Sequence, residues 1–114
     1  MKIQKFEDII SWQKSRELSL MIYKIFMNNK DFGFRDQIQR AAISIGNNIA
    51  EGFERKSNNE LKHFLYIAKG SAGEVRSMAQ IAFELGYFNK QDFDKVNSLS
   101  TEISKLISGF IKTL

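Results

Sequence analysis

Cysteine and proline are both absent from this sequence of 114 residues, and histidine occurs once. Without cysteine the chain has no disulfides, no thiol nucleophile and no thiolate ligands for zinc. A single histidine leaves little material for a multi-histidine metal site or for a carboxylate–histidine relay. The absence of proline removes the residue that most often breaks a helix, so long uninterrupted helices become possible.

Long apolar runs are also missing. No stretch approaches the roughly 18 apolar residues that a membrane-spanning helix needs, and no apolar segment of a secretory signal follows the first lysines. We therefore expect a cytoplasmic protein without membrane contact. The 43% hydrophobic and 26% charged residues are typical of one globular domain, here residues 1–114. The net charge of +4 permits an anionic partner without requiring one.

Four segments have helical periodicity, and three polar or glycine-containing breaks separate them. They predict helices over about 9–28, 34–53, 59–85 and 90–113. A Ser-x-x-Glu capping box, Ser57 to Glu60, marks the start of the third helix, and Asn89 is a suitable N-cap for the fourth. Because the breaks are short, neighbouring helices should be antiparallel. The prediction is an all-α, up-down-up-down four-helix bundle in one domain.

The third helix carries the strongest periodic signal, a seam that alternates steps of four and three residues. Its members are Leu61, Leu65, Ala68, Ala72, Val75, Ala79, Ala82 and Gly86. Most of them are small, so another helix should approach this face closely.

Catalytic patterns are scarce. Glu60 and His63 have the Glu-x-x-His spacing of di-iron bundles, but such sites need a second pair that one histidine cannot supply. No phosphate-binding loop or nucleophile motif occurs, and Gly70 to Gly73 lie inside the predicted third helix, where small residues serve packing. We expect neither an enzyme nor a metal, cofactor or small-molecule substrate.

A polar row accompanies the apolar stripe of the second helix, and two polar residues interrupt a stripe of the third. The row contains Gln37, Arg40, Ser44, Asn48, Glu51, Ser71 and Glu74. Polar groups in an apolar seam need hydrogen-bond partners, so we expect a structural network in which Arg40 pairs with Glu74 or Glu51. The alternative is that the row is a solvated helix face.

Positive charge exceeds negative charge mainly in residues 1–30, which hold six basic and three acidic residues. The candidate nucleic-acid-binding residues are Lys14, Arg16 and Lys24. In one copy this is a weak basic footprint, but a symmetric assembly would repeat it around a ring. The first two helices also carry more apolar residues than one small bundle can bury. The resulting candidate oligomer interface contains Trp12, Leu20, Tyr23, Met27 and Ile43.

Residues 37–52 read Q-I-Q-R-A-A-I-S-I-G-N-N-I-A-E-G. This stretch resembles the core motif Q-I-x-R-A-A-x-S-I-x-x-N-I-A-E-G of the bacterial four-helix-bundle proteins of 23S rRNA intervening sequences. Residues 6–14, 64–74 and 85–87 resemble other conserved stretches of that family. Gly46 stands where the family often has proline, so a kink in the second helix should be softer here.

The resemblance implies a ring-like homopentamer, and nothing in the family implies catalysis. It also implies a relation to the accessory proteins of diversity-generating retroelements, which bind nucleic acid and a reverse transcriptase. Two hypotheses follow. The protein is a non-enzymatic oligomer that binds RNA or a ribonucleoprotein partner through a shared basic surface, or it is a structural or protein-interaction module without nucleic-acid binding.

Overall fold

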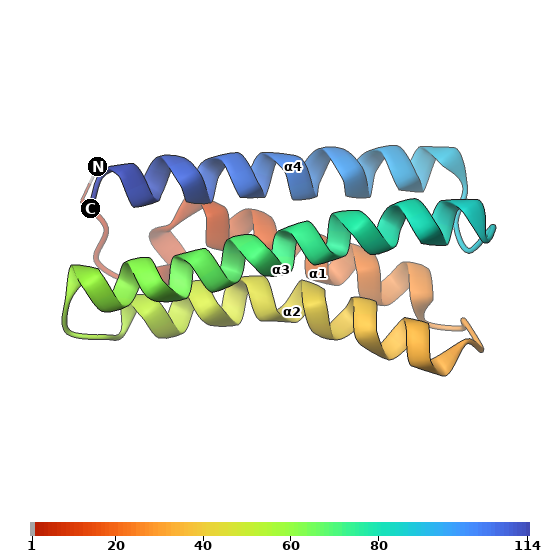
Figure 1. Cartoon of the computed structure of the whole chain (residues 1–114), viewed down its shortest axis with the longest axis horizontal. Helices are drawn as coiled ribbons and strands as arrows, with labels where there is room; N and C mark the ends of the chain where they lie inside the picture. The colour runs from red at the N-terminus through yellow and green to blue at the C-terminus, as the bar shows by residue number, and fades with distance from the viewer. Residues whose placement is uncertain (1) are drawn as a thin grey trace.

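The computed structural model describes residues 2–114; Met1 lies outside them. A short 3-10 turn, η1 (Phe6–Asp8), precedes four helices: α1 (Ile10–Phe26), α2 (Phe32–Phe53), α3 (Asn58–Glu84) and α4 (Lys90–Lys112). No strand occurs in the described residues. The helices run along the long axis of a body of 42 × 22 × 18 Å, with both termini at one end (Figure 1). The predicted all-α four-helix bundle is confirmed.

Each helix packs against two neighbours: α2 against α1 and α3, and α4 against α3 and α1. The outer face of α1 and α2 is therefore opposite the outer face of α3 and α4. The core contains large aliphatic and aromatic side chains from all four helices, among them Leu18, Ile22, Phe26, Ile38, Ile45, Ile49, Val96, Ile103 and Ile107.

The predicted seam of α3 is buried from Leu61 to Ala82. Its last predicted member, Gly86, is exposed and lies beyond the helix, with a φ of 74°. That left-handed conformation favours glycine, and it turns the chain so that the Tyr87 N–H donates to the Ala82 carbonyl (2.8 Å). The seam therefore ends with a helix stop rather than with another packing residue.

Side-chain caps determine where three of the helices begin. The Ser57 Oγ accepts from the Glu60 N–H (3.2 Å), and the Asn89 Oδ1 accepts from the Asp92 N–H (2.8 Å), as the sequence predicts. The second helix begins at Phe32, earlier than the predicted position 34. The reason is Asp31, whose Oδ1 accepts from the Phe34 N–H (3.3 Å) and so caps α2 before Gly33.

Asp31 also ties together the two connections at the end of the bundle opposite the termini. The Tyr87 hydroxyl donates to the Asp31 Oδ2 (2.5 Å), across from the α3–α4 connection to the α1–α2 connection. This hydrogen bond to a carboxylate, aided by partial desolvation, raises the pKa of Tyr87 above its ordinary value of 10.0. The bond stabilises the neutral phenol and fixes the positions of both connections.

Two buried glycines let α2 approach its neighbours. A Cβ on Gly46 would lie 2.8 Å from the Ser15 Oγ of α1, and a Cβ on Gly52 would lie 2.7 Å from the Phe64 Cβ of α3. Gly52 is inside α2, so it serves close packing rather than helix termination. The expectation for Gly70 and Gly73 is wrong: both are exposed, and a Cβ on either would meet nothing within 4 Å.

We predict opposite effects for two Gly→Ala substitutions. Gly52→Ala should lower the free energy of unfolding by about 1–3 kcal/mol, because the Phe64 Cβ is fixed to the backbone and α2 must move away from α3. Gly70→Ala should raise it by about 0.5–1 kcal/mol, because alanine favours an exposed helix interior. Urea titration followed by circular dichroism measures both. A stable Gly52→Ala variant would contradict the close approach of these helices.

Candidate nucleic-acid and assembly surfaces

The polar row links α2 to α3 through part of its length. The Gln37 Nε2 donates to the Glu74 Oε2 (3.3 Å), and the Ser44 and Ser71 hydroxyls lie 3.0 Å apart. The Asn48 Nδ2 donates to the Ser44 carbonyl (2.8 Å) and to the Ser44 Oγ (2.9 Å). The three partly buried residues of this group satisfy one another, so the row fixes the register between the two helices.

The expected ion pair of Arg40 with Glu74 or Glu51 is wrong. Arg40 is exposed, and among residues 2–114 no carboxylate lies within 4.0 Å of its guanidinium. Glu51 accepts from the Arg55 Nη2 instead (2.9 Å). At about 100° per residue, Arg40 and Glu51 lie further toward solvent than Ser44 on the same helix. Both charges remain hydrated, which avoids the desolvation cost of a buried pair.

We predict that the row stabilises the fold through its amide and hydroxyls rather than through Arg40. Asn48→Ala should lower the free energy of unfolding by about 1–2 kcal/mol, because it removes two partly buried hydrogen bonds. Arg40→Ala should change it by less than about 0.5 kcal/mol. Chemical denaturation of both variants measures the difference, and an equal loss in each would contradict this assignment.

The candidate cations of α1 do not form one surface within a single chain. The Lys14 Nζ lies 3.6 Å from the Glu17 Oε2, whereas Arg16 and Lys24 are exposed. Arg16 projects from α1 about 160° around the helix from Lys14, and Lys24 lies about 80° from each of them. Their role in nucleic-acid binding stays a prediction that depends on assembly.

A more continuous basic surface lies on the opposite face, where α3 meets α4. On α3, Lys62, Lys69 and Arg76 follow one another at intervals of seven residues, and on α4 Lys105 and Lys112 do the same. Side chains seven apart lie on nearly the same side of a helix. We call these five cations the α3/α4 basic row.

Two contacts between α3 and α4 show which cations of one helix lie level with which cations of the other. The Gln80 Nε2 donates to the Asn97 Oδ1 (3.5 Å), and the rings of Phe83 and Phe93 stack with centroids 4.8 Å apart. From this antiparallel register and a rise of about 1.5 Å per residue, cations of α3 and α4 alternate along a line of about 21 Å. The order is Arg76, Lys105, Lys69, Lys112 and Lys62.

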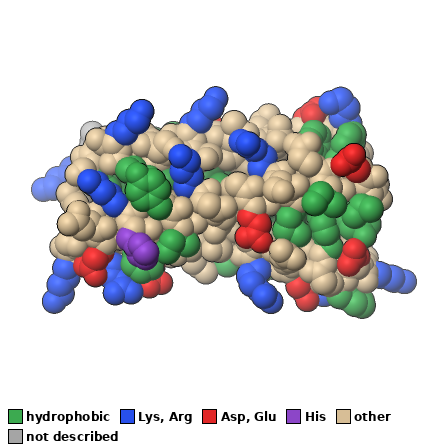
Figure 2. Space-filling view, in the orientation of Figure 1, with side chains coloured by type: hydrophobic (Ala, Val, Ile, Leu, Met, Phe, Trp, Pro, Cys, Tyr) green, Lys and Arg blue, Asp and Glu red, His purple; other side chains and the backbone are tan. Residues whose placement is uncertain are grey.

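None of the five cations of this line forms an ion pair with a described residue. Within residues 2–114, no carboxylate lies within 4.0 Å of any of the five cations. Glu74 faces α2, whereas Glu102 lines a groove along α4 together with Lys105 but forms no ion pair with it. Figure 2 shows Lys and Arg over the upper part of this view toward the end with the termini, whereas Asp and Glu lie lower or at the opposite end.

Tyr66 adds an aromatic surface beside the α3/α4 basic row. Its side chain is 59% exposed, and it lies four residues after Lys62 and three before Lys69 on α3. Charge counts by segment missed this surface, because the three glutamates of α3 balance its three cations in number. Glu60 and Glu74 lie on other sides of the helix, and Glu84 lies on the same side but beyond the Arg76 end of the row. The seven-residue repeat of Lys62, Lys69 and Arg76 was the signal that could have found it.

Exposed apolar side chains gather on the outer face of α1 and α2. Leu20, Tyr23, Met27 and Ile43 are 51%, 42%, 61% and 39% exposed. Tyr23 and Ile43 line one shallow groove between the two helices. Together with Arg16, the three residues of α1 step by four, three and four, the spacing of a helix-pairing seam. Four members of the predicted interface therefore share one face.

Trp12 differs from the other members of the predicted interface. It is half-buried, packs edge-on against Phe6 with ring centroids 5.2 Å apart, and lies over Gly46. Its position on α1 turns it toward α2 and η1 rather than outward. The structure gives Trp12 a packing role within the chain.

Residues 7–109 match the family model of the 23S rRNA-intervening sequence protein. The chain belongs to this family. A crystal structure of a protein of unknown function of the S23 ribosomal protein family, from Bacteroides thetaiotaomicron, is similar with a TM-score of 0.84 and 32% identity. The similarity covers 90% of this chain and 98% of that chain. A comparison with curated proteins gives no match.

In this family member, few other groups of described residues have the features of a ligand-binding or metal-binding site. Glu60 and His63 line a small exposed groove with Arg55 and Phe64, and His63 meets the Phe64 ring edge-on at 5.4 Å. Residues 2–114 contain no group of three or more potential metal-ligating side chains. None of their helices is both long and apolar enough to cross a membrane.

Proposed function

We propose that this protein is a non-enzymatic, cytoplasmic RNA-binding bundle that holds single-stranded RNA on the α3/α4 face. The observation that carries the proposal is the α3/α4 basic row: five cations in one line without a carboxylate partner. Cations that are not already paired can replace the counterions of phosphates, and the released ions drive binding. A line, rather than a compact cluster, follows a nucleic-acid backbone.

Tyr66 favours a single strand over a duplex. An exposed aromatic ring beside a row of cations can stack on an unpaired base, whereas the bases of a duplex are already stacked. RNA, rather than DNA, is supported by membership in a family named for intervening sequences of 23S rRNA.

We propose further that the protein assembles with copies of itself through the outer face of α1 and α2. Exposed apolar residues in a helix-pairing pattern support this, since contiguous apolar surface usually marks an interface. The number five comes from the family resemblance. A ring of five joins two different surfaces at every contact, so the α1/α2 face must meet a second surface of the next copy. The proposal places that second surface outside the basic row, so that assembly repeats an accessible row in every copy. Repetition strengthens binding to one long strand.

The alternative function is a structural or protein-interaction module, with a reverse transcriptase among the partners that the resemblance suggests. The apolar α1/α2 face favours it, because that face could serve assembly or a protein partner without any RNA. The two functions differ in what the basic row does. Under the alternative, the five cations are a solvated surface and their removal changes no affinity.

We predict that Lys69→Ala, Arg76→Ala and Lys105→Ala together weaken binding to a fluorescein-labelled oligouridine of about 20 nucleotides by about tenfold or more. The slope of log affinity against log salt should fall by about 2, since each phosphate contact to a single strand contributes about 0.7. Fluorescence anisotropy over a salt series measures both quantities.

The matched control removes three cations of α1 and the connection after it that lie outside the helix-pairing seam: Lys14→Ala, Lys24→Ala and Lys30→Ala. It should retain most of the affinity of the unmodified protein. A larger loss in the control would move the binding surface to α1, as the sequence predicts. Equal affinity of all three proteins, or tighter binding of a duplex of the same length, would contradict the proposal.

A further inference from the structure

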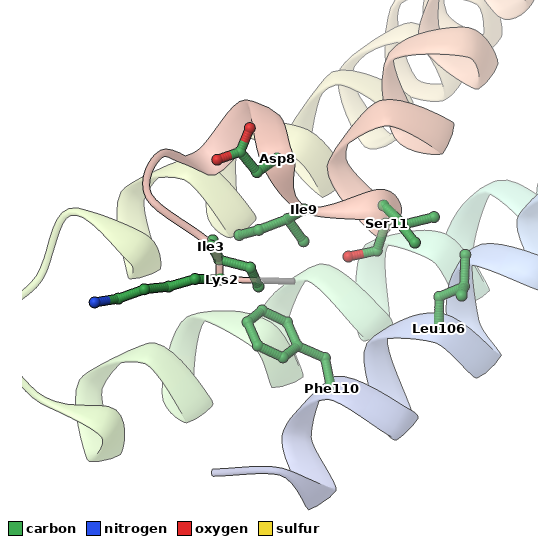
Figure 3. Close-up of a pocket in the computed structure, with 8 residues that line it drawn as sticks. Lys2, Ile3, Asp8, Ile9, Ser11, Leu106 and Phe110 are labelled. Carbon is green, nitrogen blue, oxygen red and sulfur yellow. The ribbon is translucent and has the colours of Figure 1, made fainter.

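A pocket of about 340 Å³ lies at the end of the bundle that holds both termini. It is half open, and it is lined by the N-terminal segment, the start of α1 and the last turns of α4 (Figure 3). Most of its lining is apolar, from Ile3, Ile9, Ile10, Leu106 and Phe110. Its size and lining are those of a site for a small organic molecule.

Ser11 supplies an unsatisfied hydrogen-bonding group in this lining. The residue is 2% exposed, and its Oγ has no hydrogen-bond partner in residues 2–114. The other two buried serines donate to backbone carbonyls: Ser15 to Trp12 (2.7 Å) and Ser100 to Val96 (2.8 Å). A buried hydroxyl without a partner is costly, so the exception needs an explanation.

The local backbone explains why Ser11 lacks the usual partner. In a helix, a serine commonly donates to the carbonyl one turn earlier, which for Ser11 belongs to Glu7. Glu7 belongs to η1, and the extended backbone of Ile9 between η1 and α1 takes the Glu7 carbonyl out of the helical position below Ser11. The Ser11 oxygen points toward the pocket, as Figure 3 shows, but its own surface is covered, so a ligand must displace the lining slightly to reach it.

The charged side chains around the pocket do not favour an ionic ligand. Lys2 and Asp8 both line it, with opposite charges. The Asp8 Oδ2 accepts from the Gln4 N–H (3.1 Å) and the Lys5 N–H (3.3 Å), so this carboxylate holds the N-terminal segment over the pocket. The remaining polar group inside is the neutral Ser11 hydroxyl. A neutral occupant fits this balance better than a charged one.

We infer that the pocket binds a small neutral molecule with an apolar body and one hydroxyl or carbonyl group. The apolar body lies against Ile9, Leu106 and the Phe110 ring, where an aromatic ring gains most from contact. The polar group forms the hydrogen bond that Ser11 lacks. This site is separate from the α3/α4 basic row, so the inference does not depend on RNA binding.

The test uses p-cresol, toluene and benzoate as probes, with methyl NMR of the full chain. The resonances of Ile9 and Leu106 should shift saturably with p-cresol. Toluene, which lacks the hydroxyl, should bind about three- to tenfold more weakly, as the loss of one neutral hydrogen bond predicts. Benzoate should bind more weakly than p-cresol because its charge has no net partner in the pocket.

Ser11→Ala should reduce the affinity for p-cresol to that for toluene while leaving the affinity for toluene unchanged. Ser15→Ala is the matched control: it is a buried serine one turn later on α1 that does not line the pocket. The control should keep the preference for p-cresol. The inference is overturned if no probe shifts these methyl groups saturably, or if Ser11→Ala keeps the preference. It is also overturned if the same resonances shift with protein concentration alone, since a second copy then fills the pocket.

Discussion

The close approach of α2 to α3 is the contact on which the rest of this bundle depends. It requires Gly52, because a Cβ there would lie 2.7 Å from the Phe64 Cβ. On α3 the facing seam is built largely from alanines with almost no exposed surface. Short side chains bring the backbones together, and only at that separation can the Ser44 and Ser71 hydroxyls meet at 3.0 Å. Packing and polar contacts therefore specify the same register.

That register determines which side chains remain outside. Once α2 and α3 pair through small residues, α1 and α4 pack along the opposite edges of the pair and complete the bundle. The leucine, tyrosine, methionine and isoleucine on the outer α1/α2 face then have nothing within the chain to cover them. The lysines and arginine of the outer α3/α4 face form one line in which no cation is paired with a described carboxylate. An apolar surface and a basic surface on opposite sides can act at the same time without competing.

The helices, the caps at Ser57 and Asn89 and the α3 seam could be predicted from the sequence, because each depends on residues near one another in the chain. The start of α2 was misplaced because the cap at Asp31 outweighs the helix-breaking tendency of Gly33. The predicted ion pair of Arg40 was wrong because the polar residues on one flank of α2 do not all face the same direction. Their directions around the helix axis differ by tens of degrees, and Arg40 is among those turned toward solvent.

The α3/α4 basic row and the Ser11 pocket were not foreseen for a different reason. The row joins two helices whose register is set by tertiary contacts, so neither helix alone shows five cations in line. The pocket joins the N-terminal segment to the last turns of α4, at opposite ends of the chain. A serine's lack of a partner is visible only when every donor and acceptor nearby has been placed.

Light scattering on the protein with and without a bound oligouridine tests most directly whether the two faces act together. At micromolar concentration, the account predicts a particle several times the 13.2 kDa of one chain, and five times if the family resemblance holds. Adding RNA should raise the mass by that of the RNA while the number of protein chains per particle stays constant. A particle of one chain that binds RNA, or an assembly that dissociates when RNA binds, would contradict the account.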